Sequence, residues 1–133
     1  MANARGSIGT TNYAVEITAG HHQLTADEGP ALGGKDAGPS PYDLLCASLT
    51  ACTAITLRMY AERKGWPLTS VEVNVHFTAA NKEKGTAATI ERTLRFEGGL
   101  EAEQVARLAD IAERTPVTLT LKAGVPIATS VKS

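Results

Sequence analysis

The sequence has little excess charge and few aromatic residues, and both shortages exclude classes of partner. Its 13 lysines and arginines are balanced by 14 aspartates and glutamates. A surface that attracts nucleic acid or anionic lipid normally needs an excess of basic residues. Aromatic residues make up 5% of the chain, too few for a platform on which bases stack. We therefore predict neither a nucleic acid nor a membrane as a partner.

Long apolar runs and cysteines are also scarce. The N-terminal stretch MANARGSIGTTNY has no apolar core typical of a signal peptide, and the uncharged run 44–57 is too short to cross a bilayer. The chain has 2 cysteines, Cys46 and Cys52, which we expect to be free thiols in a reducing cytoplasm. A chain of 133 residues can bury its own core, so we predict one soluble domain over residues 1–133.

The spacing of apolar residues predicts an α+β fold with antiparallel pairing. The expected strands are residues 11–17, 21–27, 71–77, 88–96, 116–121 and 125–131. A Gly- and Pro-rich loop is expected at 27–39, and an amphipathic helix at about 101–114.

A long central helix is expected between these strands. It begins in the stretch GPSPYDLLCASLTAC, where Ser40 can accept a free backbone N–H and Pro41 suits the first helical position. Asp43 favours the positive end of the helix dipole, and Gly65 provides a C-terminal cap. These signals predict a helix over residues 41–64.

From Leu44 to Leu57 this helix has no charged side chain on any face. A helix that is apolar or small all round is normally enclosed by other structure. One sheet in a short chain covers only one side of it. We therefore expect a second subunit to cover the other side, which makes the protein an obligate homodimer.

The two cysteines are too far apart along one helix to bond to each other. Six residues give a rise of about 9 Å, whereas a disulfide needs Cα atoms roughly 4.4–6.8 Å apart. We interpret Cys46 as a small buried side chain. For Cys52 the residues alone leave two interpretations open, packing or a reactive thiol, and a buried thiol is more often the former.

Residues 38–75, together with IERTLRFEGGL and LADIAERTPVTLTL, resemble the OsmC/Ohr family, named for osmotically inducible protein C and organic hydroperoxide resistance protein. The resemblance covers most of the chain from about residue 30. It implies an intertwined α+β homodimer, with antiparallel sheets around a long central helix and active sites at the subunit interface. It also implies that Cys52 stands at the position of the peroxidatic thiol.

Other positions depart from the pattern of the family's peroxidases. Their Glu directly after the helix-opening Pro is replaced by Tyr42, with Asp43 one place further on. Their second Cys, just before Pro-Val, is replaced by Thr115. Their Arg ahead of the helix has no counterpart, because no Arg stands between Arg5 and Arg58. A thiol that resolves the oxidised cysteine would then come from an external dithiol, or from a Cys46 of another chain.

A thiolate needs a cation or a helix N-terminus nearby, and Cys52 lies about three turns inside its own helix, far from that helix's positive end. Arg92 shares the apolar face of its strand with Ile90 and Leu94. It is either a snorkelling side chain or an interface ion pair, or it lowers the pKa of Cys52 across the interface.

Two functions remain open on the sequence. The first is a thiol-dependent peroxidase of the oxidative stress response, which reduces small organic hydroperoxides through Cys52. The second is a non-peroxidatic dimer that binds a small apolar ligand in the interface cleft, with Cys52 as packing. No zinc-like Cys or His spacing is present, so neither a metal nor a cofactor is predicted.

Overall fold

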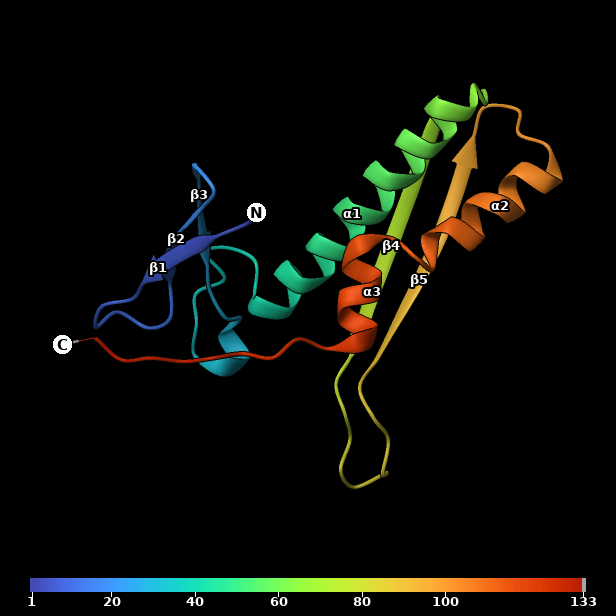
Figure 1. Cartoon of the computed structure of the whole chain (residues 1–133). Coiled ribbons are helices and arrows are strands. Elements are labelled where there is room, and N and C mark those ends of the chain that lie inside the picture. The colour runs from blue at the N-terminus through green and yellow to red at the C-terminus, as the bar shows by residue number, and fades with distance from the viewer. Residues whose placement is uncertain (133) are drawn as a thin grey trace. The chain divides into compact units, whose positions relative to one another are not determined.

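The computed structural model describes residues 1–132 as an α+β protein with two antiparallel sheets. The chain divides into two compact units, Met1–Cys46 and the residues from Ala47 onward (Figure 1). The predicted α+β class is confirmed. The prediction of one domain over residues 1–133 is not tested by this division and stays a prediction.

The first unit contains a three-stranded antiparallel sheet in the order β1-β2-β3. Its strands are β1 (Ala4–Ser7), β2 (Val15–Ala19) and β3 (His22–Ala26). Gly20 turns β2 into β3 with a φ of 62°, a left-handed conformation that glycine adopts without a steric penalty. Both predicted strands exist, although β2 begins later than expected, and β1 was not predicted.

The loop after β3 is folded around one carboxylate. Asp27 is 2% exposed, and its oxygens accept the backbone N–H groups of Glu28 (2.7 Å), Lys35 (3.1 Å) and Ala37 (3.1 Å). A short 3-10 turn, Pro30–Leu32, lies between these donors. The predicted Gly- and Pro-rich loop is therefore an ordered structure, because a buried carboxylate satisfies its backbone donors.

The helix α1 spans Pro41–Lys64, with the bounds that the sequence predicts. The Asp43 N–H donates to Ser40 Oγ (3.2 Å), and the Ser40 N–H donates to Asp43 Oδ2 (3.0 Å). This reciprocal pair is a capping box in which Asp stands in place of the usual Glu or Gln. At the other end Gly65 has a φ of 70°, as its predicted capping role requires.

The second unit is a β-hairpin covered by helices. Its strands are β4 (Ser70–Thr78) and β5 (Thr89–Glu97), paired antiparallel, and α2 (Ala102–Ala112) follows them. Alternate residues of both strands are turned inward. The buried core consists of Leu57 and Ala61 on α1, Leu68 just before β4, and Leu108 and Ala112 on α2. The hairpin packs against this core through Val71, Leu94 and Phe96. The predicted strands at 71–77 and 88–96 and the predicted helix at about 101–114 are confirmed.

The two strands predicted near the C-terminus are wrong. Residues Pro116–Ala123 form a helix, α3, with Thr115 as its N-cap residue and Gly124 following it. A proline at the first helical position and a glycine just after the end are helix signals, and they prevailed over the alternation in VTLTL. Residues 125–131 have no regular structure, and Ile127 is 89% exposed, so no strand pairs with this segment in the described chain.

One side of α1 is covered within the chain. Its buried residues, Leu49, Thr53, Leu57 and Ala61, recur every fourth position, whereas Ile55 and Met59 are 52% and 59% exposed. Enclosure of the other side by a second subunit stays a prediction. By length and composition α1 could cross a membrane, but core helices of soluble proteins also pass that test.

We predict that the Asp27 loop loosens at acidic pH. The Ala37 N–H, with those of Glu28 and Lys35, holds the pKa of Asp27 below its ordinary value of 3.8, although burial opposes this. Because the folded pKa is the lower one, the stabilisation is complete above about pH 4 and is lost as the pH falls through that lowered pKa. The amide chemical shifts of Lys35 and Ala37 should therefore move together on acidification. Their staying fixed while Asp27 protonates would contradict the prediction, and Asp27→Asn should abolish this transition.

Candidate functional site

The thiol of Cys52 lies against the start of another helix. Cys52 is partly buried on α1, and its Sγ accepts the backbone N–H of Val117, with 3.5 Å between nitrogen and sulfur. Val117 is the second residue of α3. The first N–H groups of a helix have no partner within the helix and form its positive end. The Cys52 sulfur therefore lies against the positive end of α3.

This donor was not predicted from the sequence. The positive end of α1 itself is about three turns from Cys52. Residues 116–121 were expected to form a strand, which has no such end. The signal that could have revealed the donor was present in Thr115-Pro116 and Gly124, a cap, a first-turn proline and a stop.

Thr115 stands at the N-cap of α3, two residues before Val117. It is 1% exposed, and its Oγ1 lies 2.6 Å from Thr118 Oγ1. By the resemblance, this is where the peroxidases carry their second cysteine. The backbone at this position thus leads directly to the donor of Cys52, but its side chain is a hydroxyl that forms no disulfide.

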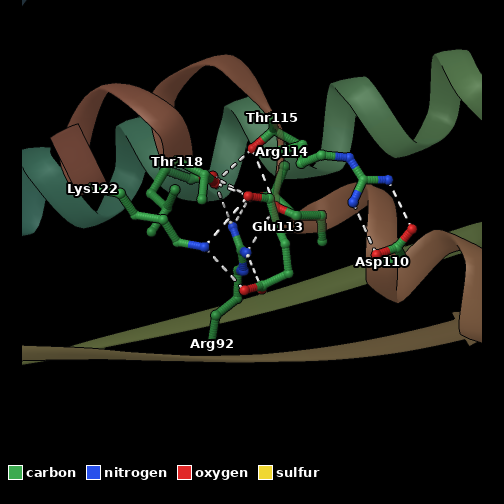
Figure 2. A network of polar contacts seen from close by, with 10 residues as sticks. Arg92, Asp110, Glu113, Arg114, Thr115, Thr118 and Lys122 are labelled. Atoms are coloured by element: carbon green, nitrogen blue, oxygen red, sulfur yellow. Dashed lines mark hydrogen bonds and ion pairs between the residues drawn. The ribbon is translucent and has the colours of Figure 1, made fainter.

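Arg92 reaches from the inward face of β5 to three helices, as Figure 2 shows in part. Its side chain is 11% exposed. Nη1 donates to Thr53 Oγ1 on α1 (3.0 Å) and to Thr118 Oγ1 on α3 (2.9 Å). Nη2 donates to the Ala112 carbonyl at the end of α2 (2.8 Å) and to Glu113 Oε2 (3.1 Å). All four terminal N–H bonds of the guanidinium are thereby used.

The expectations for Arg92 concerned an ion pair and an effect on Cys52. The ion pair with Glu113 is formed within one chain, and none of the contacts recorded for residues 1–132 joins Arg92 to the Cys52 sulfur. A direct electrostatic effect of Arg92 on Cys52 stays a prediction. The sequence singled out Arg92 by its position on an apolar face, but it gave no signal for the partners Thr53, Thr118 and Glu113.

Glu113 forms ion pairs with two cationic side chains at the end of α2. Its Oε1 accepts from Lys122 Nζ (3.1 Å) and its Oε2 from Arg92. Lys122 and then Arg92 hold the pKa of Glu113 below its ordinary value, so this carboxylate is ionised at neutral pH. Both cations also lie where the last carbonyls of α2 need donors.

The remaining candidates lie in the first unit. Tyr42 is 58% exposed, and Asp43 caps the start of α1 as described above. The structure therefore gives Asp43 a local role in helix formation. Within residues 1–132 no group of three or more His, Cys, Asp or Glu side chains could hold a metal ion.

A sequence model of the family described as OsmC-like protein matches residues 33–130. The chain belongs to the OsmC family. A search of curated proteins gives no match. The resemblance to OsmC/Ohr proteins stated from the sequence is thus confirmed.

Solved structures share the fold of this OsmC-family chain. The OsmC-like protein of Mycoplasma pneumoniae has a TM-score of 0.76 and 17% identity, over 92% of this chain and 87% of that one. The organic hydroperoxide resistance protein OsmC of Legionella pneumophila has a TM-score of 0.70 and 21% identity, over 92% of this chain and 89% of that one. The organic hydroperoxide resistance protein OhrB of Bacillus subtilis has a TM-score of 0.59 and 23% identity, over 90% of each chain. The predicted OsmC-like fold is confirmed.

We predict that Arg92→Met lowers the free energy of unfolding by about 2–4 kcal/mol, because it leaves the buried Ala112 carbonyl and threonine hydroxyls without their charged donor. The matched control is Arg95→Met on the same strand, whose side chain is 70% exposed and pairs with Glu72 (3.0 Å). That change should cost less than about 1 kcal/mol. Urea unfolding at one fixed protein concentration measures both. Equal losses would show that the Arg92 contacts contribute no more than a surface ion pair.

Proposed function

We propose that this protein reduces organic hydroperoxides with the thiol of Cys52, and that an external thiol restores it. The proposal rests on one contact, the Val117 N–H that donates to Cys52 Sγ from the N-terminus of α3. Cysteines at helix N-termini ionise more readily, and the thiolate is the form that attacks a peroxide. The chain lacks the Glu and the Arg of the family's peroxidases, and we propose that the Val117 N–H takes their part.

The reaction balances with one peroxide and two reducing thiols. The Cys52 thiolate attacks the terminal oxygen of R–O–O–H, the O–O bond breaks, and the alkoxide takes a proton to leave as the alcohol R–OH. The sulfur is oxidised to a sulfenic acid. A first external thiol displaces water and forms a mixed disulfide with Cys52. A second thiol attacks that disulfide and releases the Cys52 thiol.

The reductant is external because this chain offers no nearby second thiol. Thr115 occupies the position where the family's peroxidases carry it, and neither Cys46 nor Cys52 is part of a disulfide. Cys46 lies six residues before Cys52 on the unbroken helix α1, a rise of about 9 Å. We expect oxidised Cys52 to appear as a sulfenic acid or a mixed disulfide.

The names of two structural neighbours also favour this function. The proteins of Legionella pneumophila and Bacillus subtilis are named organic hydroperoxide resistance proteins, and both share the fold of this chain. We propose a role in the oxidative stress response on that ground. We also propose that the protein works in the cytoplasm, where a free thiol such as Cys52 stays reduced.

We propose a homodimer as the working form. Ile55 and Met59 leave an exposed apolar face on α1 opposite its buried stripe, and a second copy of the chain would cover it. Burial of such side chains is favourable by about 1.5–3 kcal/mol each when complete.

We predict that Cys52→Ser abolishes turnover of cumene hydroperoxide with a dithiol reductant, because serine is not oxidised by a peroxide. The measurement is the rate at which the hydroperoxide is consumed, which should fall to the uncatalysed rate in Cys52→Ser. Cys46→Ser is the matched control and should retain turnover within about twofold of the wild type.

Equal turnover by the wild type and Cys52→Ser would remove the peroxidase function. The non-peroxidatic alternative, a dimer that binds a small apolar ligand, would then be the one to pursue. A Cys46–Cys52 bridge within one chain, seen by mass spectrometry after oxidation, would overturn the external reductant.

We predict a dimer in sedimentation equilibrium at micromolar concentration, with twice the chain mass of 13.9 kDa. Met59→Asp should shift the protein towards the monomer, because dimerisation would bury an unpaired carboxylate. Lys84→Asp places the same group on the exposed turn of the β4–β5 hairpin and should leave the dimer intact. A stable wild-type monomer would contradict the proposal.

A further inference from the structure

One nitrogen atom connects the two segments that meet at the thiol. Thr53 follows Cys52 on α1, and Thr118 follows Val117 on α3. The hydroxyls of both threonines accept hydrogen bonds from Nη1 of Arg92, at 3.0 and 2.9 Å. The N–H···S contact between Cys52 and Val117 therefore lies one residue away from this bridge on each side.

The bridge is buried and its geometry is fixed from several directions. Thr53 is 0% exposed and Thr118 is 5% exposed. Thr53 Oγ1 donates its own hydrogen to the Leu49 carbonyl (2.7 Å), which turns its lone pairs to Arg92. Thr118 Oγ1 lies 2.6 Å from Thr115 Oγ1 at the cap of α3. Buried hydroxyls with all their partners present hold one orientation.

The other side of the guanidinium is anchored to α2. Nη2 donates to the Ala112 carbonyl and to Glu113, which Lys122 also holds from α3. A guanidinium is planar and its donors diverge at fixed angles, so fixing Nη2 also fixes the direction of Nη1. The position of the bridge is thus set by β5, which carries Arg92, and by the C-terminal end of α2, not by α1 or α3 alone.

We propose that Arg92 is a positioning residue for Cys52. Through Thr53 and Thr118 it holds the N-terminus of α3 against the sulfur, and it thereby sets the reactivity of a thiol that it does not touch. The proposal deepens the proposed function, and it rests on that function only in assuming that the reactive thiol serves to reduce hydroperoxides. It differs from a direct charge effect, which would need the guanidinium but neither threonine hydroxyl.

The test measures alkylation of Cys52 by iodoacetamide at pH 7, in the full chain with Cys46→Ser so that one thiol reacts. Thr53→Val and Thr118→Val keep the charge and remove one arm of the bridge each. We expect each to slow alkylation roughly 3- to 10-fold, the range that a helix N-terminal interaction allows. Thr93→Val, an exposed neighbour of Arg92 on β5, is the matched control and should react at the wild-type rate.

A purely structural role would give the opposite sign. If the two threonines only kept α3 in place, their loss would loosen α3, expose the sulfur and make alkylation faster. Thr118→Ser restores the hydroxyl and should bring the rate back to within about twofold of the wild type. Hydrogen exchange at the Val117 amide gives a second readout and should be faster in Thr118→Val than in Thr118→Ser.

Arg92→Lys separates charge from geometry. A lysine keeps the charge, but its single nitrogen cannot serve both hydroxyls and the end of α2 as the guanidinium does. We expect slow alkylation in this variant as well. Wild-type rates in Thr53→Val and Thr118→Val would overturn the proposal, as would a Thr118→Ser rate no higher than that of Thr118→Val.

Circular dichroism and urea unfolding establish that each variant is folded before its alkylation rate is measured. If Arg92→Lys does not fold, the comparison of Thr118→Val with Thr118→Ser decides whether the proposal holds. No peroxide enters the measurement. Failure of hydroperoxide turnover with the expected alkylation pattern would sink only the proposed function. Turnover by the wild type without that pattern would sink only the role of Arg92.

Discussion

The arrangement of the second unit depends on a cation held almost out of water. Removing a guanidinium from solvent is costly unless each donor finds an acceptor, and here a carboxylate, a carbonyl and two hydroxyls fill that role. The acceptors come from three helices. The cation can keep its hydrogen bonds only if the three helices keep their mutual positions, so a polar interaction specifies how an otherwise apolar core is assembled.

Local signals made part of this structure predictable. The start of α1 follows from the Ser40–Asp43 capping box and its end from Gly65, each a local signal at the boundary that it sets. The hairpin follows from strict alternation along β4 and β5. The helix α3 was missed because VTLTL suits a strand as well as a helix, and in such a short segment the caps at Thr115 and Gly124 decide.

The candidate site was predictable only in part, because its contacts join distant segments. The family resemblance singled out Cys52, and parity along the strand singled out Arg92. Nothing in the sequence pairs Arg92 with Thr53, 39 positions away, or Cys52 with Val117, 65 positions away. Such pairs arise from tertiary packing. In the sequence, a threonine whose hydroxyl binds a buried arginine cannot be told from any other threonine.

Thr115 has a consequence for timing. A peroxidase with two cysteines closes its own disulfide at a rate fixed by its geometry, whatever its surroundings. In the proposed reaction Thr115 removes that step, so the lifetime of the oxidised sulfur is governed by the concentration of thiol outside the protein. Under a shortage of reductant the oxidised form would accumulate, and its abundance would then report the thiol supply of the cell.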